Sequence, residues 1–191
     1  MLTQEQAMEL IEKSGAFLTG HFKLTSGRHS DHYMQAAQML QYPEYTEQLA
    51  RHLAEKFQDA GVEVVIGPAM GGIIVSYEVA RQLKVPSLFA ERENGKMTLR
   101  RNFSIRPGQK VLVVEDVVTT GGSVEEVIDL VRFHGGEVVG VGVLVDRSNG
   151  MAHFDVPMNS VLQLNIQSWE ASECPLCKAG AGEAYKPGSR K

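Results

Sequence analysis

Short apolar runs rich in β-branched residues constrain the fold of this chain more than any other feature. The clearest runs lie at 62–66, 111–114 and 138–145, and 85–90 is a further strand candidate. A strand without a polar face is typical of a sheet that is buried on both sides. Between such runs, apolar residues recur at helical spacing, as they do in 124–131. This alternation predicts βαβ units, and therefore an α/β fold with a mostly parallel central sheet flanked by helices.

The length of 191 residues is that of one ordinary domain, and no shift in composition marks a second one. Near the N-terminus, Thr3 and Gln6 fit a helix capping box. Asn94-Gly95 is a signal for a hairpin with a two-residue turn. The hairpin lies in a basic segment that is our candidate for a mobile arm, and its cations are Arg92, Lys96, Arg100 and Arg101.

The charge balance limits the classes of ligand. The chain has 19 lysines and arginines against 23 aspartates and glutamates, a net charge of −4, which argues against a protein that coats nucleic acid. An anionic ligand would therefore need a local cluster of donors. We find no apolar stretch long enough to cross a bilayer and no signal-peptide pattern at the start. With only two cysteines there is no disulfide framework, and we expect a cytoplasmic protein that contacts no membrane.

The segment from Val111 to Ser123 is the most informative part of the sequence. An apolar strand is followed by two carboxylates, Glu115 and Asp116, then by a loop of small residues and the start of a helix. Ser123 and Glu126 fit a second capping box, which would place the helix N-terminus at the loop. The backbone N–H groups of the loop would then face outward, where the helix dipole favours an anion. The pattern predicts a phosphate-binding site.

The acidic pair distinguishes this segment from the common nucleotide-binding loops. Carboxylates repel a phosphate, so they need a different partner. Ribose hydroxyls donate hydrogen bonds and Mg²⁺ takes oxygen ligands, and either would suit the pair. A ligand with a terminal phosphate, an adjacent diol and a metal-bound diphosphate would satisfy the whole arrangement. The alternative is a purely structural strand–turn–helix, which would not need Glu115 and Asp116.

The residues from Val113 to Ser123 closely resemble the phosphoribosyl diphosphate (PRPP) signature of the type I phosphoribosyltransferases. The residues from Leu24 to Ser30, followed by Tyr33 and Met34, are similar to the N-terminal segment of the orotate phosphoribosyltransferases in that family. Residues 145–147 resemble the strand end where those proteins place an arginine on the base. An arginine fork suits orotate, because orotate is a planar carboxylate.

The resemblance covers residues 5–150 and implies one phosphoribosyltransferase domain (1–191) with an N-terminal hood (1–40), a mobile basic loop (91–106) and a C-terminal extension (168–191). It implies transfer of the phosphoribosyl group from PRPP to orotate, giving orotidine 5′-phosphate and diphosphate. Mg²⁺ is the implied cofactor, held mainly through PRPP with Asp116 as a candidate ligand. The implied assembly is a homodimer that shares the loop across subunits. A purine phosphoribosyltransferase and a PRPP-sensing regulator without turnover are the alternatives.

The resemblance also implies roles for individual residues. The implied catalytic residues are Glu115, Asp116 and Lys96. The residues implied to bind PRPP are Arg92, Lys96, Glu115, Asp116, Val117, Val118, Thr119, Thr120, Gly121, Gly122 and Ser123. The residues implied to bind orotate are Thr119, Arg147, Tyr33 and Met34. The turn from Gly67 to Ile73 either binds the diphosphate through backbone N–H groups or is an ordinary βα turn.

The chain departs from the family pattern at positions where many members carry a lysine. Those positions are held here by Thr25, Gly71 and Glu93. The contacts to the diphosphate are therefore open, and the candidate substitutes are Lys23, Arg100 and Arg101.

Cys174 and Cys177 have the spacing of a zinc knuckle but supply only two ligands, whereas a structural zinc has four. Two reduced thiols in a C-terminal turn are therefore the interpretation that the sequence favours. A zinc site that is shared across a dimer, or completed by His153 or another histidine, is the open alternative.

Overall fold

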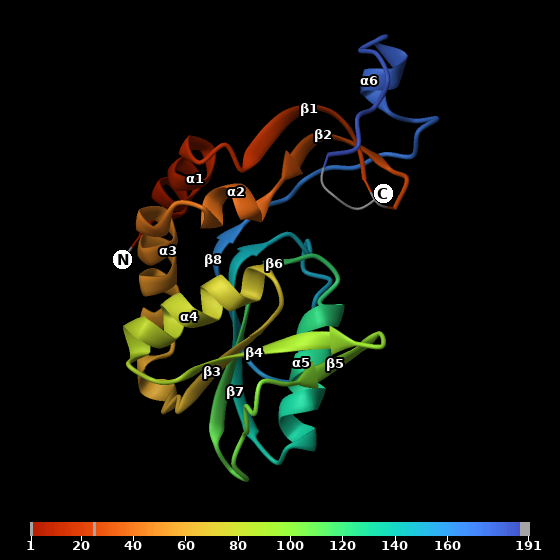
Figure 1. Cartoon of the computed structure of the whole chain (residues 1–191). Helices are drawn as coiled ribbons and strands as arrows, with labels where there is room; N and C mark the ends of the chain where they lie inside the picture. The colour runs from red at the N-terminus through yellow and green to blue at the C-terminus, as the bar shows by residue number, and fades with distance from the viewer. Residues whose placement is uncertain (1, 25, 188–191) are drawn as a thin grey trace.

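A six-stranded sheet forms the centre of the structure, a computed structural model that describes residues 2–24 and 26–187 (Figure 1). The strand order is β5-β4-β3-β6-β7-β8, and all neighbours are parallel except β4 and β5. The strands are β3 (Val64–Pro68), β4 (Ser87–Glu93), β5 (Lys96–Leu99), β6 (Lys110–Val118), β7 (Glu137–Asp146) and β8 (Met158–Gln163). The predicted α/β fold with a mostly parallel sheet is confirmed.

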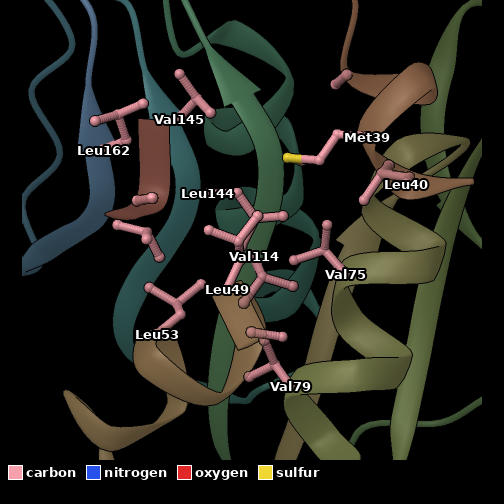
Figure 2. Packing of buried hydrophobic residues seen from close by; sticks show 14 of the residues in the cluster. Met39, Leu40, Leu49, Leu53, Val75, Val79, Val114, Leu144, Val145 and Leu162 are labelled. Carbon is pink, nitrogen blue, oxygen red and sulfur yellow. The ribbon is translucent and has the colours of Figure 1, made fainter. Parts of the chain in front are cut away.

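Helices cover both faces of the sheet. On one face lie α3 (Pro43–Glu55) and α4 (Gly71–Leu83), and on the other lies α5 (Gly122–Phe133). Figure 2 shows the first interface, where buried side chains of α3 and α4 meet those of β6, β7 and β8. Each fully buried leucine or valine there contributes about 1.5–3 kcal/mol, so the sheet centre is a rigid support for the turns at its edge. None of the described helices combines the length and the apolar composition that a membrane crossing requires.

The N-terminal residues form a small unit, which we call the hood, and its helices pack into the same core as one face of the sheet. It consists of α1 (Gln4–Lys13), β1 (Phe17–Lys23), β2 (His29–Met34) and α2 (Ala36–Leu40), with β1 and β2 paired antiparallel. The hood lies beyond the carboxyl end of the sheet (Figure 1). After β8 the chain runs along the hood to a short helix, α6 (Pro175–Lys178).

The hydrogen-bond pattern confirms the capping box at the first helix and the two-residue hairpin turn. Thr3 accepts a hydrogen bond from the backbone N–H of Gln6, whose side chain accepts one from the Thr3 N–H. Asn94 and Gly95 join β4 to β5 with φ angles of 51° and 81°, the positive values that this kind of turn needs.

The second predicted capping box is wrong. The helix α5 begins at Gly122, and Gly121 precedes it with a φ of 87° and no side-chain cap. Glu126 is unavailable to Ser123 because its carboxylate pairs with Arg92 of β4. The helix N-terminus nevertheless lies at the predicted loop.

Two strands differ from the sequence expectation. β6 continues through Val118, so the acidic pair Glu115 and Asp116 lies within the strand rather than after it. β8, at the edge of the sheet, was not predicted, because its sequence mixes polar and apolar residues. An edge strand has fewer neighbours to bury it, and its periodicity is correspondingly weak.

Candidate active site

Three adjacent parallel strands, β3, β6 and β7, end at one edge of the sheet. From β3 the chain continues outward to β4, whereas from β6 it continues outward in the opposite direction to β7. Open α/β sheets bind ligands at such a reversal of strand order, outside the carboxyl ends of the strands. The ends of these three strands and the segments that follow them carry most of the residues that the sequence selected.

A hollow of about 70 Å³ lies at the end of β6. Its lining residues are Glu115, Val117, Val118, Thr119, Thr120, Gly121, Gly122, Ser123 and Val124. A Cβ added at Gly121 would lie 3.0 Å from the Phe154 ring in a backbone conformation that favours glycine. Glu125 makes the first helical hydrogen bond, to the carbonyl of Gly121, which leaves the N–H groups of 122–124 without helical partners. These donors at the positive end of the helix dipole suit a phosphate.

Glu115 and Asp116 lie side by side in β6 but differ in exposure. Glu115 is 9% exposed, whereas Asp116 is half-buried. The Glu115 carboxylate accepts a hydrogen bond from the Asp116 N–H at 3.1 Å, and the Asp116 carboxylate accepts one from the Val117 N–H at 2.8 Å. Burial, reinforced by the charge of Asp116, raises the pKa of Glu115 to about 9. Glu115 therefore holds a proton at neutral pH, which limits the repulsion of an arriving phosphate.

The turn after β3 approaches the acidic pair so closely that it has no room for another side chain. A Cβ added at Gly71 would lie 2.1 Å from Oδ2 of Asp116, and one at Gly67 would lie 2.5 Å from the carbonyl oxygen of Gly72. A lysine at Gly71 would thus displace the Asp116 carboxylate, which gives that departure from the family pattern a steric reason. Diphosphate binding by this turn stays a prediction.

Arg147 follows β7, and its backbone N–H donates to the carbonyl of Val118 at 2.8 Å. Its side-chain Nε is buried and has no hydrogen-bond partner among the described residues. Burial lowers the pKa of this guanidinium, and the neighbouring Tyr33 partly opposes the shift. A buried guanidinium nitrogen without a partner is costly, and a ligand carboxylate would supply that partner. Met34 packs in the hydrophobic core, and its contact with orotate stays a prediction.

An ion pair holds the β4–β5 hairpin against α5. Arg92 donates to both carboxylate oxygens of Glu126, each at 2.7 Å. Lys96 lines a groove between β5 and α5 and is not among the residues that line the phosphate hollow. The structure therefore brings Glu115 and the loop together around one hollow. Asp116, the next residue of β6, and Lys96 are not among the residues that line this hollow.

The candidate substitute cations lie elsewhere. Arg100 pairs with Glu93 at 3.5 Å, and Arg101 bonds to a glutamate of β4 at 2.9 Å. Lys23 lines a hollow of the hood together with Cys177. Thr25 lies outside the described residues. None of these cations lines the phosphate hollow of the described structure.

A cluster of side chains joins the hood to the C-terminal extension, and the sequence had not identified which histidines belong to it. Cys174 and Cys177 are free thiols that lie beside His21 and His29. The candidate partner His153 instead lines a hollow next to α5. No local pattern connects these residues, because His29 and Cys177 are 148 positions apart in the chain.

Comparisons with known proteins agree with one another. Residues 35–176 match the family model described as the phosphoribosyl transferase domain. The chain is 59% identical over 190 residues to an orotate phosphoribosyltransferase of Desulforamulus reducens, covering 100% of this chain and 99% of the relative. It also resembles the crystal structure of the orotate phosphoribosyltransferase from Aeropyrum pernix, with a TM-score of 0.70 and 30% identity over 92% of this chain and 98% of that one.

An adenine phosphoribosyltransferase from Rhodothermus marinus has a TM-score of 0.67 with this chain at 24% identity, covering 84% of this chain and 99% of that one. This likeness concerns the fold alone. The sheet and its helices are therefore common to proteins named for different bases, and the base must be distinguished by individual residues.

Proposed function

Because this chain belongs to the phosphoribosyltransferase family, and within it to the orotate phosphoribosyltransferases, we propose how its residues transfer the phosphoribosyl group of PRPP to orotate. The products are orotidine 5′-phosphate and diphosphate, as pyrimidine nucleotide biosynthesis requires. The buried, unpartnered Nε of Arg147 beside the phosphate hollow carries the assignment of the base. Orotate presents a carboxylate to such a group, whereas a purine does not.

The hollow at the end of β6 binds the 5′-phosphate of PRPP. The free N–H groups at the start of α5 and the hydroxyls of Thr119, Thr120 and Ser123 are its donors. Glu115 and Asp116 then lie where the ribose hydroxyls follow the phosphate, and they accept hydrogen bonds from those hydroxyls. Fixing the sugar at both ends holds its C1 in place for the incoming base, and such positioning accounts for much of the rate in reactions of this kind.

Diphosphate leaves C1 through a transition state with oxocarbenium character, so positive charge develops on the ribose and negative charge on the leaving group. The carboxylate of Asp116 stabilises the first, and the cations of the hairpin stabilise the second. Arg92 must leave Glu126 to take part. An exposed ion pair of this kind contributes about 0–1 kcal/mol, so its release costs little. The closed hairpin would also exclude water from the reacting carbon.

Mg²⁺ is the cofactor that we assign to this reaction. Asp116 has carboxylate oxygens that fit this ion. Its Oδ1 accepts a hydrogen bond from the Val117 N–H, and its Oδ2 lies at the turn that contains Gly71. Mg²⁺ is commonly bound by one or two carboxylates together with substrate phosphates. When bound with PRPP, it would neutralise charge on the leaving diphosphate.

We assign a homodimer in which the hairpin of each subunit serves the site of the other. Lys96 lies outside the hollow of its own chain. Large apolar side chains are exposed at the start of α4, next to the site, namely Met70 at 82%, Ile74 at 45% and Tyr77 at 67%. Exposed apolar surface of this kind is typical of interfaces. The two free cysteines suit the reducing cytoplasm, where we place the protein.

The direct test mixes the full-length protein with PRPP, Mg²⁺ and orotate and follows the loss of orotate absorbance. We expect turnover with orotate and none with adenine, guanine or hypoxanthine. Turnover with a purine alone, or with no base at all, would overturn the assignment. Repeating the assay in the presence of excess chelator tests the metal.

Arg147→Ala tests the site of the base. Losing a hydrogen-bonded charge pair costs about 1.5–3 kcal/mol, so the KM for orotate should rise about 10–100-fold while PRPP affinity stays within about twofold. Arg132→Ala is the matched control, because Arg132 lies on α5 and forms an exposed ion pair with Asp155. Equal losses for both substrates would contradict the role of Arg147.

Mixed dimers test the shared hairpin. Lys96→Ala and Asp116→Asn should each be inactive alone. If the hairpin serves the other subunit, a mixed dimer has one site with both lesions and one site with neither. Equal mixing should then restore about a quarter of the wild-type activity, since half of the dimers are mixed and each has one intact site. No recovery, with mixed dimers confirmed by mass spectrometry, would place Lys96 in the site of its own chain.

A further inference from the structure

Two cysteines from the C-terminal extension and two histidines from the hood converge on one point. The candidate ligand atoms of His21, His29, Cys174 and Cys177 all lie within 4.8 Å of one another. We call these residues the Cys–His cluster. Nε2 of His21 lies 3.0 Å from Nδ1 of His29, 3.6 Å from Sγ of Cys174 and 3.5 Å from Sγ of Cys177. Cys177 Sγ also lies 3.3 Å from Nδ1 of His29.

Hydrogen bonds alone do not account for this convergence. The other nitrogen of His21, Nδ1, lies 2.9 Å from the carbonyl oxygen of Gly182 and must carry a proton to donate to it. In a neutral imidazole, Nε2 then has a single lone pair and no proton. One lone pair cannot serve three neighbours at once. A cation at the centre would use that lone pair and those of the other three atoms together.

Four of the six separations between the ligand atoms are close to those of a tetrahedral metal site. Bond lengths of about 2.3 Å for zinc–sulfur and about 2.0–2.1 Å for zinc–nitrogen imply ligand separations of about 3.3 Å between nitrogens and about 3.6 Å between nitrogen and sulfur. In the structure the nitrogen–nitrogen distance is 3.0 Å, and three nitrogen–sulfur distances are 3.3, 3.5 and 3.6 Å. The side chains would need only small shifts to bind an ion.

The fold places each ligand for a local reason. His29 pairs with Lys23 in the β1–β2 ladder. His21, two residues before Lys23, therefore lies diagonally across from His29, and the centroids of the two rings are 5.0 Å apart. Cys174 immediately precedes α6 and its carbonyl accepts from the N–H of Lys178, so the first turn of α6 returns Cys177 to the same side. The His21–Gly182 contact orients the imidazole, as the outer partner of a metal-bound histidine commonly does.

We propose that the Cys–His cluster binds one Zn²⁺ as a structural site. Two thiolates and two imidazoles in tetrahedral arrangement are a preferred zinc donor set. All four positions are filled by protein, so no position is left for a substrate, and the site is distinct from the phosphate hollow. The zinc would fasten the C-terminal extension onto the hood.

The surrounding contacts support a fastening role. Arg28, next to His29, donates to Ser168 at 2.9 Å and also bonds to Glu170. His29 and Trp169 form a backbone bridge with paired 2.8 Å hydrogen bonds. These interactions are individually weak and half-exposed, whereas a metal bound at four points would hold the extension as one unit. β2 also carries Tyr33, so the zinc would stabilise the strand that reaches Arg147.

Metal content is the first measurement. The full-length chain is purified under reducing conditions from cells supplied with zinc, and its metals are measured by mass spectrometry. We expect one zinc per chain in the wild type and in His153→Gln, the control histidine outside the cluster. Cys177→Ser and His21→Gln should lose that zinc. These two residues are not fully buried, which favours folding of the variants.

The wild type alone also tests the proposal. Replacement of the zinc with Co²⁺ should produce the visible absorption of a tetrahedral site and a thiolate charge-transfer band. A chelator should lower the melting temperature of the wild type and leave that of Cys177→Ser unchanged. Wild-type protein that holds no zinc, that holds iron or copper instead, or that has a Cys174–Cys177 disulfide under these conditions would overturn the proposal. Stoichiometric zinc retained in Cys177→Ser would do the same.

Discussion

Replacing Glu115 with glutamine removes an ionisable group that folding places in an unfavourable environment. Burial and the charge of Asp116 raise its pKa from the ordinary 4.5 to about 9. Between these values the folded protein holds a proton that the unfolded chain has released. By proton linkage, the free energy of unfolding must then fall as pH rises through this window. Glu115→Gln cannot titrate, so the variant should lack this decline.

The size of the effect follows from the width of the window. Each pH unit inside it changes the free energy of unfolding by about 1.4 kcal/mol for one proton. From pH 5 to pH 8 the upper bound is therefore about 4 kcal/mol, and partial water access and relaxation reduce it to about 2–4 kcal/mol. Between pH 5 and pH 8, the free energy of unfolding of the wild type should fall by this amount relative to that of Glu115→Gln. The wild type should bind PRPP tightly, whereas the variant should not.

Urea unfolding at several pH values between 5 and 8.5 measures this difference, provided that the m-value stays constant. Glu12→Gln on α1 is the matched control, because Glu12 is exposed and its replacement should leave the pH dependence unchanged. Asp116→Asn removes the negative neighbour and should make the decline shallower. A wild-type-minus-variant difference that stays flat from pH 5 to pH 8 would refute a protonated, buried Glu115.

Three further substitutions test other parts of the structure. Gly71→Ala must move the Asp116 carboxylate by more than about 1 Å and should lower kcat/KM for PRPP about 100-fold, with a melting curve to exclude unfolding. Glu126→Gln frees Arg92 and should lower the KM for PRPP up to about fivefold at low salt, an effect that high salt should abolish. Thr3→Ala should cost about 1 kcal/mol in urea unfolding without changing kcat, whereas an unchanged midpoint would show that its cap is dispensable.

The sequence predicts the sheet well because strands buried on both faces must be apolar throughout, as Val111–Val114 and Val138–Val145 are. The Thr3–Gln6 cap and the Asn94-Gly95 turn were equally predictable, since each depends on neighbours within a few residues. The phosphate hollow also follows from one continuous segment. Local chemistry thus determines most of the scaffold and one half of the candidate site.

The rest depends on partners that are distant in sequence. Glu126 forms no cap with Ser123, because Arg92 from another element takes its carboxylate and Gly121 lets the helix begin earlier. Gly71 has no room for a side chain because Asp116 of β6 lies against the turn that follows β3, and the sequence does not show that these two residues meet. The ligands for the cysteine pair were likewise unpredictable, since any of the six histidines could have been brought to it.

The pairing of the hood with the C-terminal extension has a consequence for synthesis of the chain. The backbone of β1 bonds to Tyr185, and His29 bonds to Trp169, so β1 and β2 leave the ribosome long before these partners do. Until then, β1 and β2 present open strand edges that can pair with other chains. The hood should therefore be the final part of the enzyme to fold and the part most dependent on chaperones during translation.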